Sequence, residues 1–136
     1  MRWLASLATS RSGATVTEFA FVAPALLMMI MGLVDGSRMF WTRQVLSEVA
    51  FSTARCMSVG TACNTTTLQK SYAVARARSY GVRVIAANVT PTTNSVCRGQ
   101  AGSNSITVST PFVSSLRGFL PMPRTLSATV CFPFLS

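Results

Sequence analysis

The sequence predicts an α+β protein: one long hydrophobic N-terminal helix, then a small head of one helix and a three- or four-stranded antiparallel sheet. The first observation is that residues 19–34 carry no charged or strongly polar side chain, so much of the 49% apolar content lies in one segment. The second is that short β-branched or alternating runs occur only after residue 81, between turn residues. With 136 residues, the chain has room for one domain beyond the helix.

The first helix is predicted from about Ala14 to Arg55. Its membrane span begins at Ala14 and ends at Val34, a length of roughly 30 Å at 1.5 Å per residue, which is enough to cross a bilayer core. Pro24 lies inside the span, where membrane helices tolerate proline, and a bend is expected at Pro24 or at Gly36. Apolar residues then recur at helical spacing, which predicts that the helix continues as an amphipathic one.

The head begins with a polar loop over residues 60–67, and a second helix follows. Thr66 and Gln69 have capping-box spacing, and Gly81 suits the left-handed conformation that ends a helix. One face of this helix would carry Leu68, Tyr72, Ala75 and Ser79. Strands are predicted at residues 82–85, 105–109 and 126–132, with a turn at residues 90–95.

The charge distribution argues against an enzyme and against a bound metal or cofactor. The chain has 12 basic and 3 acidic residues and no histidine, and the acids Glu18, Asp35 and Glu48 all lie in the first third. Acid–base catalysis and hard-metal binding need carboxylates or imidazole, and residues 49–136 contain neither. That region carries eight basic residues: Arg55, Lys70, Arg76, Arg78, Arg83, Arg98, Arg117 and Arg124.

All four cysteines follow the hydrophobic segment, and an even number in a small region favours two disulfides in an oxidising compartment. Zinc is the rival interpretation, but the closely spaced cysteine pairs of most zinc sites are missing. Three connectivities are possible. The pairing expected here is Cys56 with Cys63, at the end of the long helix, and Cys97 with Cys131, between two β segments.

The first 13 residues contain two arginines and no acid, like the basic start of a secretory signal. Residues 32–36, GLVDG, make a poor signal-peptidase site at the far end of the apolar run, so the segment is expected to remain as an anchor. The leader ends at Gly13. After four intervening residues, Glu18 and Phe19 open the apolar helix.

The stretch RSGATVTEFAFVAPALLMMIMGLVDGSRMFWTRQVLSEVA resembles the N-terminal module of TadE-like minor pilins of tight-adherence (Tad, or Flp) pili, and its start resembles a type IV prepilin processing site. The resemblance covers residues 11–59 and implies that a prepilin peptidase cuts between Gly13 and Ala14. It departs from the family at Asp35, where glutamate is commoner. The implied domains are a leader (1–13), a transmembrane and amphipathic helix (14–59) and an extracytoplasmic, type IV pilin-like head (60–136).

Glu18 has a physical argument of its own. A carboxylate within a hydrophobic segment costs up to a few kcal/mol on insertion scales, so a functional role is the default hypothesis. The alternative is an interfacial residue that stays hydrated. Cleavage would create an α-amino group on Ala14, and a neighbouring subunit could pair that cation with Glu18. The resemblance implies the same role, so Glu18 and Phe19 are the expected assembly residues.

The expected function is therefore that of a minor pilin, or pseudopilin, in the assembly or initiation of a Tad/Flp-type pilus used in surface adhesion. Expected partners are other pilins, the inner-membrane Tad machinery and the prepilin peptidase. The expected location is the bacterial inner membrane, single-pass with the head in the periplasm, and incorporation into the pilus is left open. The alternative is a tip-located binding module whose basic head contacts DNA, lipopolysaccharide or another anionic surface. Specific nucleic-acid binding is not expected, because the head lacks interleaved basic and aromatic residues.

Overall fold

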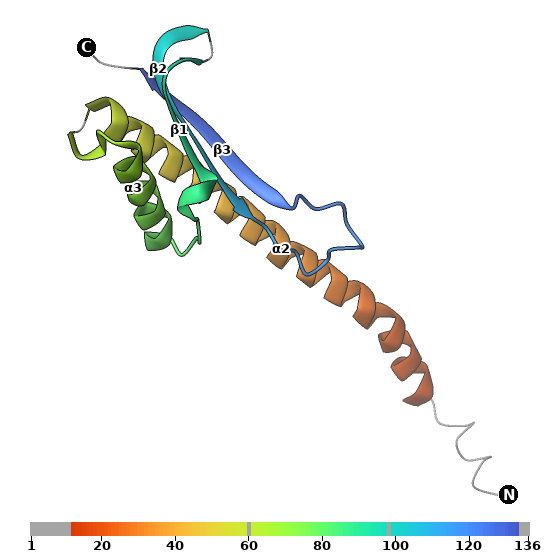
Figure 1. The fold of residues 1–136 in the computed structure, drawn as a ribbon. Coiled ribbons are helices and arrows are strands. Elements are labelled where there is room, and N and C mark those ends of the chain that lie inside the picture. The colour runs from red at the N-terminus through yellow and green to blue at the C-terminus, as the bar shows by residue number, and fades with distance from the viewer. Residues whose placement is uncertain (1–11, 60, 98, 134–136) are drawn as a thin grey trace, which may run out of the picture.

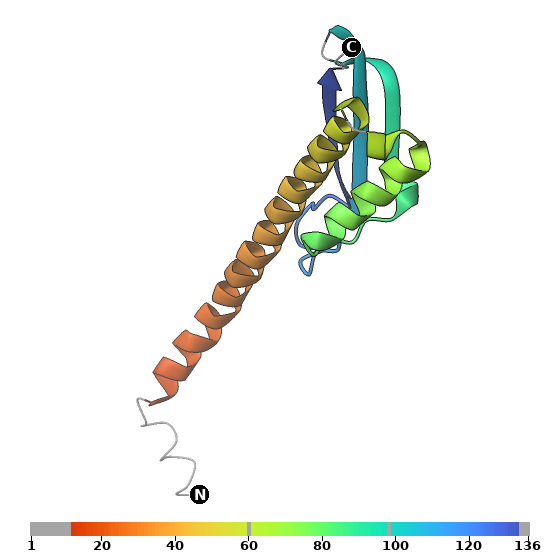
Figure 2. The same ribbon diagram turned by 90° about the vertical axis from the view of Figure 1, so that its left-hand side faces the viewer.

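The structure, a computed structural model, describes residues 12–59, 61–97 and 99–133. Helix α2, Ser12–Val59, is a single helix of 48 residues. It extends a few residues beyond both predicted ends and continues through Pro24 and Gly36 without interruption. Figure 2 shows its N-terminal half projecting alone, whereas its C-terminal half lies against the head.

The head contains helix α3 and a three-stranded antiparallel sheet in the order β1-β2-β3, which confirms the predicted α+β fold. After α2 the elements are η1 (Thr61–Cys63), α3 (Thr66–Ser79), η2 (Ala86–Asn88), β1 (Val89–Cys97), β2 (Gln100–Pro111) and β3 (Thr125–Pro133).

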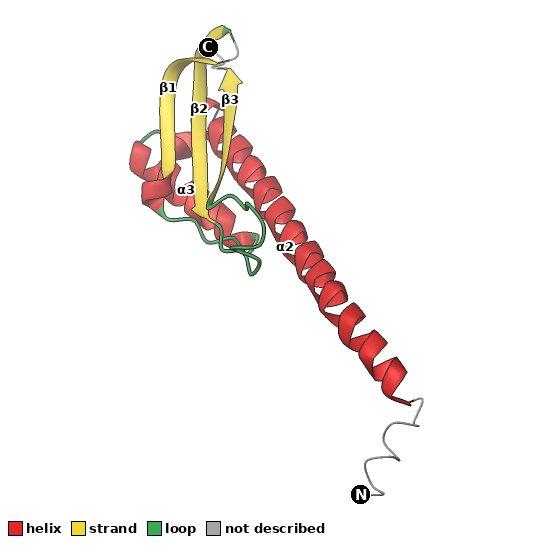
Figure 3. Ribbon diagram, turned by 90° about the vertical axis from the view of Figure 1, so that its right-hand side faces the viewer, coloured by secondary structure: helices red, strands yellow, loops and turns green. Residues whose placement is uncertain are grey.

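Both helices cover one face of the sheet, α2 over β3 and β2 and α3 beside β1 (Figure 3). Side chains alternate across a strand, so one face of β2 is buried, with Ile106 and Val108 at its centre. From α2 the core receives Val45, Leu46, Val49, Ala50 and Ala54, the apolar positions of the amphipathic half. The core therefore lies between the sheet and the part of the long helix that follows the span.

One strand and one turn predicted from the sequence are wrong. Residues 82–85 form no strand, because they pair with no described strand; Val82 and Val84 are nevertheless buried in the core. Residues 90–95 are not a turn but belong to β1. Pro91 can lie in β1 because β1 is an edge strand. Proline has no backbone N–H, and on the open side of an edge strand no neighbouring strand needs that donor.

Helix α3 differs from expectation at its start and in its buried face. The N-cap is Thr65, whose side chain accepts a hydrogen bond from the Leu68 N–H at 3.4 Å, one residue earlier than predicted. Gln69 instead donates from Nε2 to the carbonyl of Cys63 at 2.9 Å. The buried face carries Gln69, Ala73 and Ala77, because small side chains allow close approach to α2, and the predicted face is largely exposed. The stop at Gly81 is confirmed by its φ of 76°.

The structure contains two disulfides, Cys56–Cys63 and Cys97–Cys131, which is the expected pairing. Their Cα atoms are 5.7 Å and 6.2 Å apart. Strands β1 and β3 are not neighbours, so the tip of the β1–β2 hairpin has to bend for Cys97 to reach β3, and Figure 1 shows that this tip is curled. Register shifts between β1 and β2 and a positive φ at Asn94 provide this curl.

Candidate membrane and assembly site

The N-terminal half of α2 presents an apolar surface that the head does not cover. Its most apolar 18-residue window has a mean hydropathy of 2.0, and only 6% of that window is buried. The helix is therefore a candidate membrane span by length and composition. The exposed side chains include Phe19, Phe21, Val22, Leu26, Leu27, Met28, Met29, Ile30, Met31, Leu33 and Val34. A core helix of a soluble protein would bury such residues, whereas the described part of this chain leaves them exposed.

The expected processing site lies in the first turn of this helix. The carbonyl of Gly13 accepts a hydrogen bond from Thr17 Oγ1 at 3.1 Å, and Gly13 itself is exposed. Residues 1–11 of the expected leader lie outside the described residues.

The two expected assembly residues follow on the same exposed helix. Phe19 is 72% exposed, and Glu18 is also exposed. Among the described residues, no basic side chain forms an ion pair with Glu18. Both side chains are therefore accessible to lipid or to another subunit.

The structure adds a residue to which the sequence analysis gave no structural role. Asp35, the residue after the span, is 1% exposed. Its Oδ2 accepts hydrogen bonds from Ser114 Oγ at 2.6 Å, Ser115 N at 2.7 Å and Leu116 N at 3.2 Å. Arg38 Nη1 lies 3.9 Å from Oδ1, with its side chain largely in solvent. The carboxylate therefore attaches the loop of residues 112–124 to the long helix.

These contacts also set the protonation of Asp35. The hydrogen bond from Ser114 lowers the pKa of the carboxyl most, burial opposes it, and the N–H groups of Leu116 and Ser115 and the charge of Arg38 lower it further. The net effect is a pKa below the ordinary value, so the group is ionised near neutral pH. The sequence shows only that Asp35 is an acid next to the predicted span. It does not reveal that Asp35 holds the loop, because its partners lie about 80 residues away in the chain.

Taken together, the fold is that of a protein with one candidate membrane helix and a small disulfide-bonded, pilin-like α+β head. Residues 13–55, which lie within α2, match the family model described as TadE-like protein. Over this segment the chain is thus similar to a family associated with tight-adherence pili, which confirms the resemblance found in the sequence. No curated protein and no solved structure matches the chain.

Proposed function

We propose that the protein is a minor pilin, or pseudopilin, that a prepilin peptidase processes and that takes part in the assembly or initiation of a Tad/Flp-type pilus used in surface adhesion. The observation that carries the proposal is the uncovered apolar half of α2, which lies within the TadE-like match and holds one carboxylate near its start. Such a surface suits two environments in turn, the lipid bilayer and a bundle of neighbouring pilin helices.

Glu18 would favour the helix bundle over the lipid bilayer. In the membrane its charge is unfavourable within an apolar segment. After cleavage, the new α-amino group of Ala14 on one subunit pairs with Glu18 of the next as helices bundle. The partners are other pilins, the prepilin peptidase and the inner-membrane assembly machinery. No catalytic role is assigned to any residue.

The proposed orientation is supported by the disulfides and by the resemblance to TadE-like pilins. Both disulfides lie in the head, which favours an oxidising, extracytoplasmic compartment for the C-terminal end of α2 and everything after it. The cleavage site then lies at the cytoplasmic end of the helix, where a prepilin peptidase would meet it.

The assembly role is tested by replacing Glu18. Glu18→Val and Glu18→Gln should insert and be processed, because the leader is intact and the segment becomes more apolar. Both should be depleted from pili, because the amino terminus of the neighbour is left unpaired, and breaking a buried pair typically costs about 3–5 kcal/mol. The measurement is an immunoblot of membrane and sheared-pilus fractions together with total pilus yield.

Glu18→Asp is the matched control, since it keeps the charge and should retain part of the assembly. Normal amounts of Glu18→Val protein in pili, with normal piliation, would show that Glu18 is only an interfacial residue and would remove its assembly role.

A further inference from the structure

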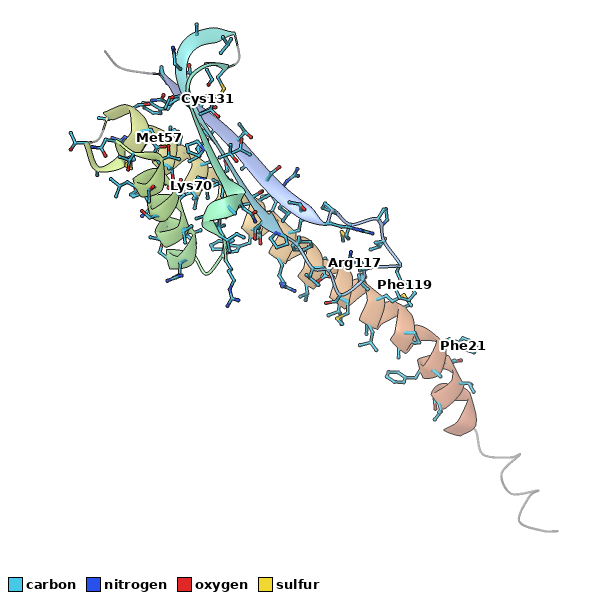
Figure 4. The ribbon with its side chains drawn as sticks, in the orientation of Figure 1. Phe21, Met57, Lys70, Arg117, Phe119 and Cys131 are labelled. Atoms are coloured by element: carbon cyan, nitrogen blue, oxygen red, sulfur yellow. A yellow bond between two sulfur atoms is a disulfide. The ribbon has the colours of Figure 1, made fainter. Side chains whose placement is uncertain are left out.

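The loop of residues 112–124, which joins β2 to β3, reaches back along α2 toward the membrane span (Figures 1 and 4). Its base is closed by a hydrogen bond from the Phe112 N–H to the carbonyl of Arg124 at 2.9 Å. Within it, the N–H groups of Phe119 and Leu120 donate to the carbonyl of Leu116 at 3.0 and 3.2 Å. Gly118, with a φ of 111°, permits this turn. The loop therefore has a defined shape.

The loop exposes apolar side chains that the described part of the protein does not cover. At its tip, Phe119 is 78% exposed, more than Phe19 within the span, and Leu120 is also exposed; near its base, Val113 is exposed. Large apolar side chains gathered at one place on a surface usually mark a contact with another molecule or a membrane.

The loop lies at the depth where the span ends. Asp35, which immediately follows the span, holds Ser114, Ser115 and Leu116. Leu116 Cδ1 approaches to 3.7 Å of the position that a Cβ on Gly32 would occupy. Gly32 is three residues inside the span from Asp35, roughly 4.5 Å closer to the bilayer centre along the helix axis. Figure 4 shows Phe119 beyond Arg117 in the direction of Phe21, so the tip points toward the bilayer.

The charges of the loop suit the surface of a phospholipid bilayer. Arg117 lies next to the apolar tip and Arg124 lies at the base of the loop, both are exposed, and residues 112–124 contain no acid. Guanidinium groups bind phosphates bidentately, and long basic side chains can keep their charge at the headgroups while their stems lie on apolar surface. Phe40 and Trp41 of α2 are also exposed just beyond the span, where aromatic side chains favour the interface.

We propose that this loop is a second membrane contact: Phe119 and Leu120 enter the headgroup boundary beside α2, and Arg117 and Arg124 bind lipid phosphates. Lipid is the occupant we infer, rather than a neighbouring subunit, because the loop is continuous with the surface of the span and carries only positive charge. The head is then held at a fixed height on the bilayer by two attachments, and the loop must leave the lipid when a subunit is extracted into an assembly. The proposal rests on the membrane anchor and does not depend on the pilus assignment.

Depth-dependent fluorescence quenching tests the contact in the full chain reconstituted into lipid vesicles. Trp3 and Trp41 are replaced by Phe, and one tryptophan is introduced as Phe119→Trp. Brominated phospholipids should quench this tryptophan strongly, and its emission should lie at a shorter wavelength than in water. Val96→Trp is the matched control, because Val96 is similarly exposed, at 74%, on strand β1 in the head, and should be quenched little.

Equal, weak quenching of Phe119→Trp and Val96→Trp would overturn the proposal. So would an emission shift at position 119 that appears only at high protein-to-lipid ratio and without bromine quenching, because a second subunit would then cover the loop.

The role of the arginines is tested by comparing vesicles with and without anionic phosphatidylglycerol. Quenching at position 119 gives the ratio of lipid-bound to free loop. On anionic vesicles this ratio should be about fivefold lower than in the protein with both arginines, both for Arg117→Gln and for Arg124→Gln. Arg78→Gln, on the exposed surface of α3, is the control and should leave the ratio unchanged. Equal effects of all three substitutions would remove the phosphate contacts from the proposal.

Discussion

At the scale of single residues, Asp35 connects two parts of the chain that the sequence keeps far apart. One carboxylate oxygen accepts three hydrogen bonds from the loop, and such charge-assisted bonds are among the stronger ones in proteins. The neighbouring Arg38 contributes less, since it is largely exposed and solvent screens exposed ion pairs.

This arrangement predicts a defined pH dependence. The pKa of Asp35 is lower in the folded protein than its ordinary value of 3.8, so its contribution to stability is fully present above that pH and is lost as the pH falls through the folded pKa. Asp35→Asn should therefore lower the Tm of the head at pH 7, and the difference from wild type should shrink below about pH 3.8. Thermal unfolding in mild detergent across this pH range measures both.

Arg38→Gln is the control and should change the Tm little at any pH. A Tm difference between Asp35→Asn and wild type that stayed constant down to pH 2 would mean that the charge of Asp35 does not hold the loop.

At the scale of elements, the close packing of α3 against α2 depends on small residues. Ala73 and Ala77 are fully buried, whereas the longer Leu68 and Tyr72 on the neighbouring face remain partly in solvent. Periodicity located the helix but not its buried face, because two adjacent faces were similarly apolar and only the contact with α2 selects between them.

The two disulfides should contribute unequally to stability. Cys97 and Cys131 are 34 residues apart and Cys56 and Cys63 are 7 apart. In the chain-entropy model these loops correspond to about 4 and about 2 kcal/mol of stabilisation, because a longer closed loop removes more freedom from the unfolded chain. Replacing each pair by serine should therefore shift the urea midpoint of the head more for Cys97 and Cys131. An equal or reversed order of midpoints would contradict this.

At the scale of the whole molecule, the chain combines a head with its own core and a helix whose N-terminal half has none. The head shares a buried core with the C-terminal half of α2, whereas most apolar side chains of the candidate span are exposed. The two disulfides and the loop that Asp35 holds belong to the head and its junction with α2.

Processing is a prediction about the whole chain. Cleavage after Gly13 should remove 13 of the 136 residues and leave a mature chain of 123 that begins ATVTEF. Intact-mass measurement of membrane-extracted protein checks this. Replacing Gly13 with a bulky residue should leave the full-length precursor in the membrane, because the proposed peptidase cuts after a glycine. A mature N-terminus beyond Val34 would contradict the pilin assignment.

The sequence by itself determined the long helix, the α+β head and the TadE-like resemblance. These features depend on composition and local periodicity: an uncharged run long enough to span a bilayer, apolar residues at helical spacing, and β-branched runs between turn residues. The stop at Gly81 was equally local, because a left-handed residue needs no distant partner.

Only the tertiary structure decided the features that depend on distant contacts. Residues 82–85 have the composition of a strand but find no ladder partner, and Pro91 is accommodated because the topology puts β1 at an edge. Asp35 reads in the sequence as a polar residue at the membrane exit, whereas the fold buries it under the loop of residues 112–124. A hydrogen bond between residues about 80 positions apart cannot be predicted from periodicity, because local spacing does not show which distant segments come together in the fold.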